Sequence, residues 1–216
     1  MDFMSNLLDL MFPPRCAFCR RILKTREKGM CSKCKETLCR TENGGAQSGE
    51  FFTTCVSPLY YEKEVRSSIL RFKFNDAKGY AKLYGELISD CIRENLTGRY
   101  DIITWVPLSA KRLKKRGYDQ AMLIAMSAAL CLSDVAVELL VKHTDVPAQS
   151  GVGGLAYRKA NISGVYSVVD EELVRGKRIL LIDDIITTGA TLSECAKTLK
   201  YSGAEEVLCC TLARTR

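Results

Sequence analysis

The fold of this chain is decided by residues 179–191, which read ILLIDDIITTGAT. Four consecutive apolar residues predict a strand that is buried on both faces, as in the centre of a parallel sheet. We expect the strand to end at two carboxylates, Asp183 and Asp184. Apolar residues at helical spacing over 192–199 predict a helix directly afterwards, which Gly203 would end. The segment therefore predicts one strand–loop–helix unit of an α/β protein.

The loop between this strand and its helix suits a phosphate monoester. A helix start presents free backbone N–H groups and the positive end of the helix dipole. Gly189 allows a ligand close to the backbone, and the hydroxyls of Thr187, Thr188 and Thr191 can donate. The two carboxylates would repel phosphate, so we expect them to serve ribose hydroxyls, with Mg²⁺ nearby, because that ion prefers oxygen ligands. Thr-Thr-Gly alone would indicate only a capped surface turn, but the complete order favours a ligand site at a strand end.

Strands and helices alternate through the rest of the chain after residue 50. Helices are predicted over 80–92 and from Asp119, as N-cap, through Leu132. Further strands are predicted at 56–61, 102–106, 137–141, 165–169 and 207–212. This alternation predicts an open parallel α/β sheet.

The first fifty residues differ from the rest in their cysteine content. Five of the eleven cysteines lie within residues 16–39, and the polar, glycine-rich stretch 41–49 is typical of a linker. We therefore predict a small N-terminal module over residues 1–50 and an α/β domain over residues 51–216.

Two C-x2-C pairs, Cys16/Cys19 and Cys31/Cys34, are separated by eleven residues. This spacing predicts a tetrahedral structural Zn²⁺ site in a zinc-ribbon-like module. The alternative is a set of buried free thiols. A module of about 35 residues cannot bury enough apolar surface to fold alone, whereas structural zinc contributes about 10–16 kcal/mol in small fingers. The metal is therefore favoured, and Cys39 is left over, although it could replace Cys34 as a ligand.

The overall composition indicates a globular, cytoplasmic protein without membrane insertion. No basic segment precedes an apolar core at the N-terminus, so we expect no signal peptide. No apolar run reaches the ~18 residues of a membrane helix. Eleven cysteines in such a protein indicate metal ligands and buried thiols rather than disulfides. The net charge of +7 is compatible with phosphate-bearing partners, and a single histidine, His143, argues against histidine-based catalysis.

A basic run contains five positive side chains in six residues, namely Lys111, Arg112, Lys114, Lys115 and Arg116. A run of this kind is often only a solvated loop. Beside an anion site it would also raise the local concentration of negatively charged ligands. It could equally follow the backbone of a single-stranded nucleic acid.

The sequence also resembles known families. Residues 179–191 resemble the phosphoribosyl pyrophosphate (PRPP) binding motif of type I phosphoribosyltransferases. The chain further resembles the ComF competence family, in which a four-cysteine module precedes a phosphoribosyltransferase-like domain. That resemblance rests on Trp105-Val-Pro107-Leu-Ser109, Arg112, Arg116-Gly-Tyr-Asp-Gln120, Gln149, Arg158, Asn161 and Gly164-Val-Tyr166.

The resemblance implies roles for individual residues. Asp183 and Asp184 would be the acids of the catalytic site and hold the ribose hydroxyls of PRPP. Residues 187–191 would cradle its 5′-phosphate through Thr187, Thr188, Gly189, Ala190 and Thr191. The pyrophosphate loop would consist of Pro107, Leu108 and Ser109, with Arg112 as an anion contact. The glycine-rich stretch 150–154 through Arg158 would be a mobile loop that closes on the substrate.

The resemblance also implies a role in natural transformation and in the handling of imported single-stranded DNA. Implied partners are PRPP with Mg²⁺, single-stranded DNA, and DNA-uptake or helicase proteins. Three functions stay open: a PRPP-binding phosphoribosyltransferase, a non-enzymatic DNA-processing adaptor that keeps the fold, and a nucleobase salvage enzyme. Salvage does not require a zinc module, and no motif identifies an acceptor base.

Overall fold

The computed structural model describes residues 13–143 and 165–216. Its centre is a parallel sheet in which β1 (Thr54–Val56), β7 (Glu206–Arg214), β6 (Arg178–Ile186) and β3 (Ile102–Trp105) follow one another. A further short strand, β2 (Leu59–Tyr60), also pairs with β7. The strand predicted from residues 179–182 therefore lies between two parallel neighbours, which confirms the α/β prediction.

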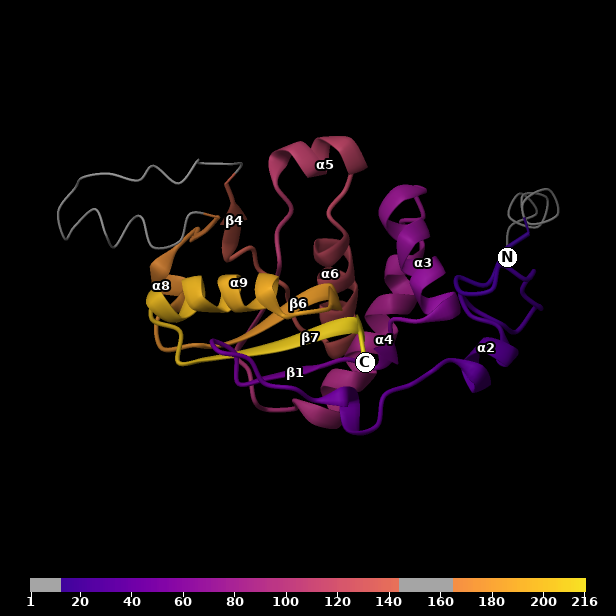
Figure 1. The fold of residues 1–216 in the computed structure, drawn as a ribbon, viewed down its shortest axis with the longest axis horizontal. Helices are drawn as coiled ribbons and strands as arrows, with labels where there is room; N and C mark the ends of the chain where they lie inside the picture. Colours follow the sequence, from indigo (N-terminus) through magenta and orange to yellow (C-terminus); the bar gives the residue numbers. More distant parts are fainter. Residues whose placement is uncertain (1–12, 144–164) are drawn as a thin grey trace.

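Helices cover both faces of the sheet (Figure 1). Along β6, Leu180 and Ile182 are buried in one core with α4 (Tyr80–Asn95) and α6 (Gln120–Leu132). Ile179 and Leu181 are buried in a second core under α9 (Ala190–Tyr201). Because successive side chains of a strand point to opposite faces, an uninterrupted apolar run is what a strand needs between two helix layers.

Three predictions about strands were wrong in detail. The single strand predicted at 56–61 is two short strands, β1 and β2, which each pair with β7. β6 does not end at Asp183 and Asp184 but continues to Ile186, because Ile185 and Ile186 still pair with β7. The strands predicted at 137–141 and 165–169 are β4 (Leu140–Lys142) and β5 (Tyr166–Val168), which pair antiparallel with each other outside the main sheet. Residues just before β4 still run along β3, since the Val137 N–H donates to the Ile103 carbonyl at 2.8 Å, and the chain then turns away.

The predicted helices are present as α4, α6 and α9, and the Asp119 carboxylate caps α6 by accepting from the Met122 N–H at 3.1 Å. Among the described residues after position 50, three helices were not predicted, namely α3 (Lys63–Phe74), α5 (Ala110–Arg116) and the short α8 (Glu171–Val174). α5 contains the whole basic run, which is therefore a helix and not a loop. The Ser109 hydroxyl caps its start, and Gly117, at φ 78°, ends it.

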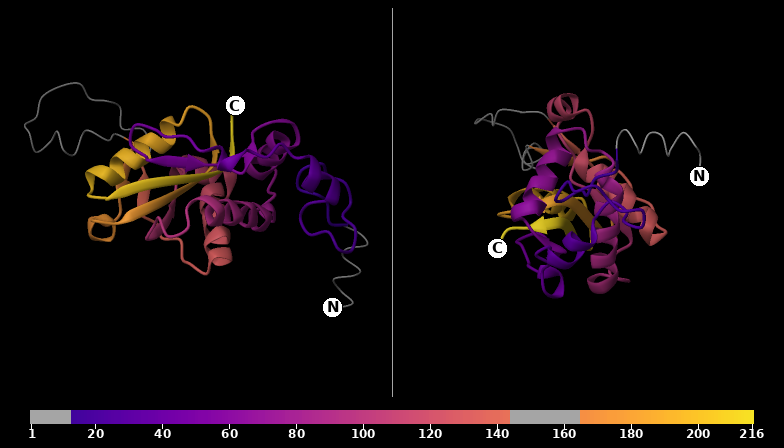
Figure 2. Two further views of the ribbon diagram at one scale, coloured as in Figure 1. Left: turned by 90° about the horizontal axis from the view of Figure 1, so that it is seen from below. Right: turned by 90° about the vertical axis from the view of Figure 1, so that its right-hand side faces the viewer.

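The cysteine-rich module contains α2 (Ser32–Thr37) and lies at the end of the molecule opposite α8 (Figures 1 and 2). The stretch predicted as a linker includes the single turn η1 (Asn43–Gly45) and is hydrogen-bonded to the sheet edge, because Gln47 pairs with Cys55. The division at residue 50 stays a prediction. Within residues 13–143 and 165–216, no helix is both long and apolar enough to cross a membrane.

Candidate functional site

A cleft of about 290 Å³ opens at the carboxyl ends of β3 and β6. The helix that follows β6 covers one face of the sheet, whereas α6, which follows β3, covers the other. The loops after these neighbouring strands therefore diverge, which is the position where open α/β sheets bind ligands. The cleft brings together parts of the predicted site from both strand ends, including Pro107, Leu108, Asp183, Asp184 and Thr187.

The predicted phosphate loop lies between β6 and α9. Thr187 and Thr188 are exposed, and Gly189 adopts φ 78° as the N-cap of α9. Glycine is required there because residues with a side chain rarely adopt this left-handed backbone conformation. No side chain caps α9 at that position, and the Thr188 hydroxyl accepts from the Ala190 N–H at 3.4 Å. The start of α9 thus presents backbone donors beside exposed hydroxyls, as an anion site requires.

The two acids have different surroundings. Asp184 is buried and forms an ion pair with Lys73, whose Nζ lies 2.8 Å from Oδ1. Asp183 is half-buried, and the loss of solvent around its carboxyl group together with the charge of Asp184 raises its pKa well above the usual value. Lys73 was missed by the sequence reasoning, because it is 111 residues from Asp184 and belongs to the unpredicted helix α3.

The loop of residues 107–109 is attached to the start of α6 by Asp119. This carboxylate accepts from the Leu108 N–H at 2.8 Å while it caps α6. Burial raises the pKa of Asp119, and the backbone donors of Leu108 and Met122 counteract part of that effect. The position of the predicted pyrophosphate loop is thus set by a side chain eleven residues further along the chain, and Arg112 extends from the following helix to the cleft.

The remaining wall of the cleft comes from the β4–β5 ribbon. Lys142 of β4 donates to the Tyr166 hydroxyl of β5 at 2.8 Å, and both line the cleft. Tyr166 is buried, which raises the pKa of its hydroxyl. The ribbon flanks residues 144–164, so the predicted closing loop with Arg158 lies outside the described residues. Tyr166 was named only as part of the ComF resemblance, and Lys142 was not singled out in the sequence, because only the ribbon brings the two side chains to the cleft.

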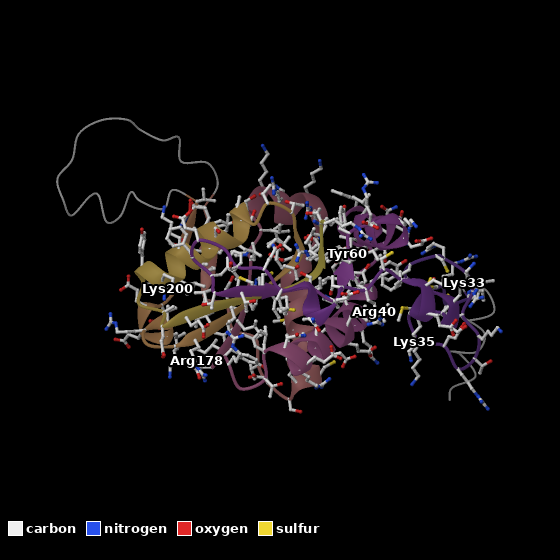
Figure 3. The ribbon with its side chains drawn as sticks, turned by 60° about the horizontal axis from the view of Figure 1, so that its bottom comes forward. Lys33, Lys35, Arg40, Tyr60, Arg178 and Lys200 are labelled. Carbon is white, nitrogen blue, oxygen red and sulfur yellow. The ribbon has the colours of Figure 1, made fainter. Side chains whose placement is uncertain are left out.

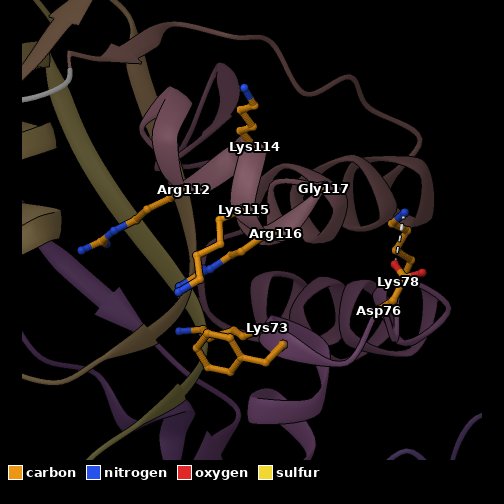
Figure 4. A pocket seen from close by; sticks show the side chains of 9 residues that line it. Lys73, Asp76, Lys78, Arg112, Lys114, Lys115, Arg116 and Gly117 are labelled. Atoms are coloured by element: carbon orange, nitrogen blue, oxygen red, sulfur yellow. Dashed lines mark ion pairs between the residues drawn. The ribbon is translucent and has the colours of Figure 1, made fainter.

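A second hollow of about 680 Å³ lies between α3 and α5, and we call it the basic groove. It is lined by Lys73, Phe74, Asp76, Lys78, Arg112, Lys114, Lys115, Arg116 and Gly117. Figure 4 shows that Lys115 and Arg116 extend toward Lys73, whereas Lys114 points away from them. Other basic residues are spread over the molecule: Lys33 and Lys35 lie at the opposite end from Arg178 and Lys200 (Figure 3).

The basic groove also contains an aromatic surface. Phe74 is 63% exposed at the end of α3, and the Arg116 guanidinium lies 5.2 Å from the centre of its ring. Lys111, which the sequence reasoning grouped with the other basic residues, is not among the residues that line the groove. Phe74 was missed because it lies near the basic run in space and far from it in the sequence.

The four predicted zinc ligands come together in space. The sulfurs of Cys16, Cys19, Cys31 and Cys34 all lie within 4.8 Å of one another, and those of Cys19 and Cys31 are 3.6 Å apart. Tetrahedral zinc with Zn–S bonds of about 2.3 Å requires sulfurs about 3.8 Å apart. Backbone N–H groups donate to the sulfurs of Cys16 and Cys31 at 3.4 Å, which suits thiolates. Cys39 is not part of this cluster.

The zinc module is attached to α3 by its first cysteine turn. Arg71 donates from Nη2 to the carbonyls of Ala17 and Phe18, both at 2.7 Å, and the Ser68 hydroxyl donates to Ala17 at 2.6 Å. The Phe18 ring is buried and packs near that of Tyr84. The last turn of the same helix carries Lys73 and Phe74 next to Arg71.

Replacing Arg71 by leucine is expected to lower the free energy of unfolding by about 1.5–3 kcal/mol for each lost bond, because its charged donor satisfies buried carbonyls. Chemical denaturation measures this change. Arg66→Leu on the exposed side of the same helix is the matched control and should have little effect. Equal denaturation midpoints for the two variants would show that the contact with Arg71 is energetically neutral.

Comparison with protein families matches two parts of the chain. Residues 7–58 match the double zinc ribbon domain, and residues 120–216 match the phosphoribosyl transferase domain. Competence protein F of Haemophilus influenzae is 29% identical over 93% of this chain and 96% of its own length. The DNA utilization protein YhgH of Escherichia coli is 26% identical over 95% and 99%. Competence protein ComFC of Streptococcus pneumoniae is 26% identical over 91% and 80%.

Two phosphoribosyl enzymes are among the solved structures that match this chain. The glutamine PRPP amidotransferase of B. subtilis, complexed with ADP and GMP, has a TM-score of 0.43 and 23% identity over 60% of this chain and 25% of its own. The adenine phosphoribosyltransferase of Thermoanaerobacter pseudethanolicus has a TM-score of 0.42 and 14% identity, over 84% of this chain and 98% of its own.

Proposed function

We propose, from the similarity of this chain to competence proteins of the ComF type and from its matches to a double zinc ribbon and a phosphoribosyl transferase domain, that it binds PRPP in the cleft between β3 and β6. The relatives named for competence and DNA utilization support a role in the uptake and handling of DNA. One observation carries the proposal: two acids, a helix start with free donors, and several cations line one cleft at the strand ends.

The three chemical groups of PRPP match three parts of the cleft. The 5′-phosphate would lie against residues 187–191, where the start of α9 donates. The ribose hydroxyls would lie on Asp183 and Asp184. The pyrophosphate would lie between the loop of residues 107–109 and Arg112. Mg²⁺ bound with the ligand would neutralise part of the pyrophosphate charge as that group leaves.

Calorimetry with PRPP and millimolar Mg²⁺ tests this proposal directly. We expect saturable binding that is tighter than that of inorganic phosphate, because phosphate alone has no contact with the acids. The absence of any PRPP binding would refute the proposed site and favour the adaptor function. Product analysis after incubation with PRPP, Mg²⁺ and a panel of nucleobases then separates transfer from binding alone.

We infer a second function, the binding of single-stranded nucleic acid, from the basic groove. Proteins that hold single strands combine a cationic groove with aromatic side chains on which bases stack. The groove between α3 and α5 provides both, with Lys73, Lys115 and Arg116 around the exposed ring of Phe74. A double helix would not present its base faces to this ring, which favours a single strand.

Binding of a labelled oligothymidylate should weaken steeply with salt, with a log–log slope of about −0.7 for each phosphate neutralised. Lys115→Glu should make this slope shallower, because its side chain extends into the groove. Lys114→Glu changes the net charge equally but alters a side chain that points away (Figure 4), so it should have the smaller effect. If neither variant changes the salt dependence, the single-stranded nucleic acid binds elsewhere on the protein.

A further inference from the structure

The cleft and the basic groove share three cations, Lys73, Arg112 and Arg116, which line both hollows. Lys115 and Phe74 line only the groove, whereas Asp183 and Thr191 line only the cleft. A ligand in either hollow thus lies against the same three positive charges.

We propose that PRPP and a single-stranded nucleic acid compete for this protein, because their sites are one continuous cationic surface. The inference rests on both ligands proposed above and adds the coupling between them. Each ligand brings several negative charges, and the three shared cations can be neutralised by only one of them at a time. The second ligand therefore meets phosphate repulsion instead of unpaired positive charge.

Arg116 provides a direct mechanical link between the two hollows. Its Nη1 donates to the Gln120 side-chain oxygen at 2.7 Å, and Gln120 lines the cleft. On the groove side, its guanidinium lies over the Phe74 ring. A nucleobase that stacks on this face of Phe74 must displace the guanidinium, which alters the contact with Gln120 in the cleft.

Lys73 links the two hollows in a second way. It is the penultimate residue of α3 and precedes Phe74, yet its amine forms the ion pair with Asp184. A strand phosphate that attracts this amine toward the groove would leave Asp184 with one fewer positive neighbour. A ligand bound at Asp184 would instead keep the Lys73 amine in the cleft. Each ligand therefore disfavours the position of Lys73 that the other ligand requires.

Fluorescence anisotropy of labelled oligothymidylate, with and without saturating PRPP, tests the competition at constant free Mg²⁺ and constant ionic strength. We expect PRPP to weaken oligonucleotide binding by at least about tenfold. The oligonucleotide should weaken PRPP binding in calorimetry by the same factor, because coupling between two binding sites is reciprocal. Chloride at matched ionic strength controls for simple screening.

Two variants separate the shared surface from the groove alone. Phe74→Ala, at an exposed position that lines only the groove, should weaken oligonucleotide binding much more than PRPP binding. Arg116→Gln should weaken both ligands and reduce the coupling factor. If both ligands bind the wild-type protein and neither changes the affinity of the other, the inference is wrong while the proposed function stands. Failure of the oligonucleotide to bind would also overturn the inference, whereas failure of PRPP to bind would refute the proposed function as well.

Discussion

Cys19→Ser is expected to abolish zinc binding and to leave the first fifty residues sensitive to protease. The four sulfurs form the set of ligands that tetrahedral zinc requires, and a serine hydroxyl does not replace a thiolate. A structural zinc contributes on the order of 10–16 kcal/mol in small fingers, far more than the apolar core of so short a module. Metal analysis of protein purified without added metal should give about one zinc for each wild-type chain and none for the variant.

Cys39→Ser is the matched control, because Cys39 belongs to the same module but lies outside the cluster. It should retain zinc and resist protease like the wild-type protein. Undiminished zinc in Cys19→Ser would contradict this ligand set, and zinc loss in Cys39→Ser would show that the spare cysteine has replaced one of the four.

The double variant Asp183→Asn, Asp184→Asn is expected to weaken PRPP by at least about a hundredfold, since two hydrogen bonds to charged groups are worth about 1.5–3 kcal/mol each. Inorganic phosphate should be affected much less, because it would contact residues 187–191 and not the acids. Calorimetry with both ligands measures the difference. Thr188→Val should instead weaken the binding of both PRPP and phosphate, since it removes a hydroxyl from the phosphate loop. The expected loss is the free energy of about one hydrogen bond to a charged group.

Asp90→Asn, an exposed position on α4 away from the cleft, controls for the loss of negative charge. Thermal unfolding of all variants separates binding from stability, which matters because Asp184→Asn also removes the ion pair with Lys73. An equal loss of PRPP and phosphate affinity in the double asparagine variant would mean that the acids do not contact the sugar.

Comparison of particular residues shows which features could be predicted from local sequence. The apolar run at 179–182 indicates a strand buried on both faces of a sheet, and it forms part of β6, which lies between β7 and β3. Asp119 has the chemistry of an N-cap and caps α6. The C-x2-C spacing places two sulfurs on each turn, and the four sulfurs converge. Each of these signals arises from residues close together in the chain.

The failures have a common cause in contacts across long sequence distances. The basic run is an exception: a solvated loop was one of its interpretations, and it forms α5, which has local caps at Ser109 and Gly117. β4 and β5 are separated by the undescribed residues 144–164, so no local pattern could show that they pair with each other. Helix α3 was missed, and with it Lys73 and Phe74.

The sequence by itself determined the parallel α/β fold and the four thiols of the module, and it located the loop after β6, because these depend on periodicity and spacing over a few residues. Only the tertiary structure decided that α3 connects the zinc module to the cleft, through Arg71 at one contact and Lys73 at the other. It also decided that Arg116 faces both Gln120 and Phe74. Such contacts depend on how the helices pack across the sheet. Packing brings together side chains that are far apart in the sequence and have no regular spacing.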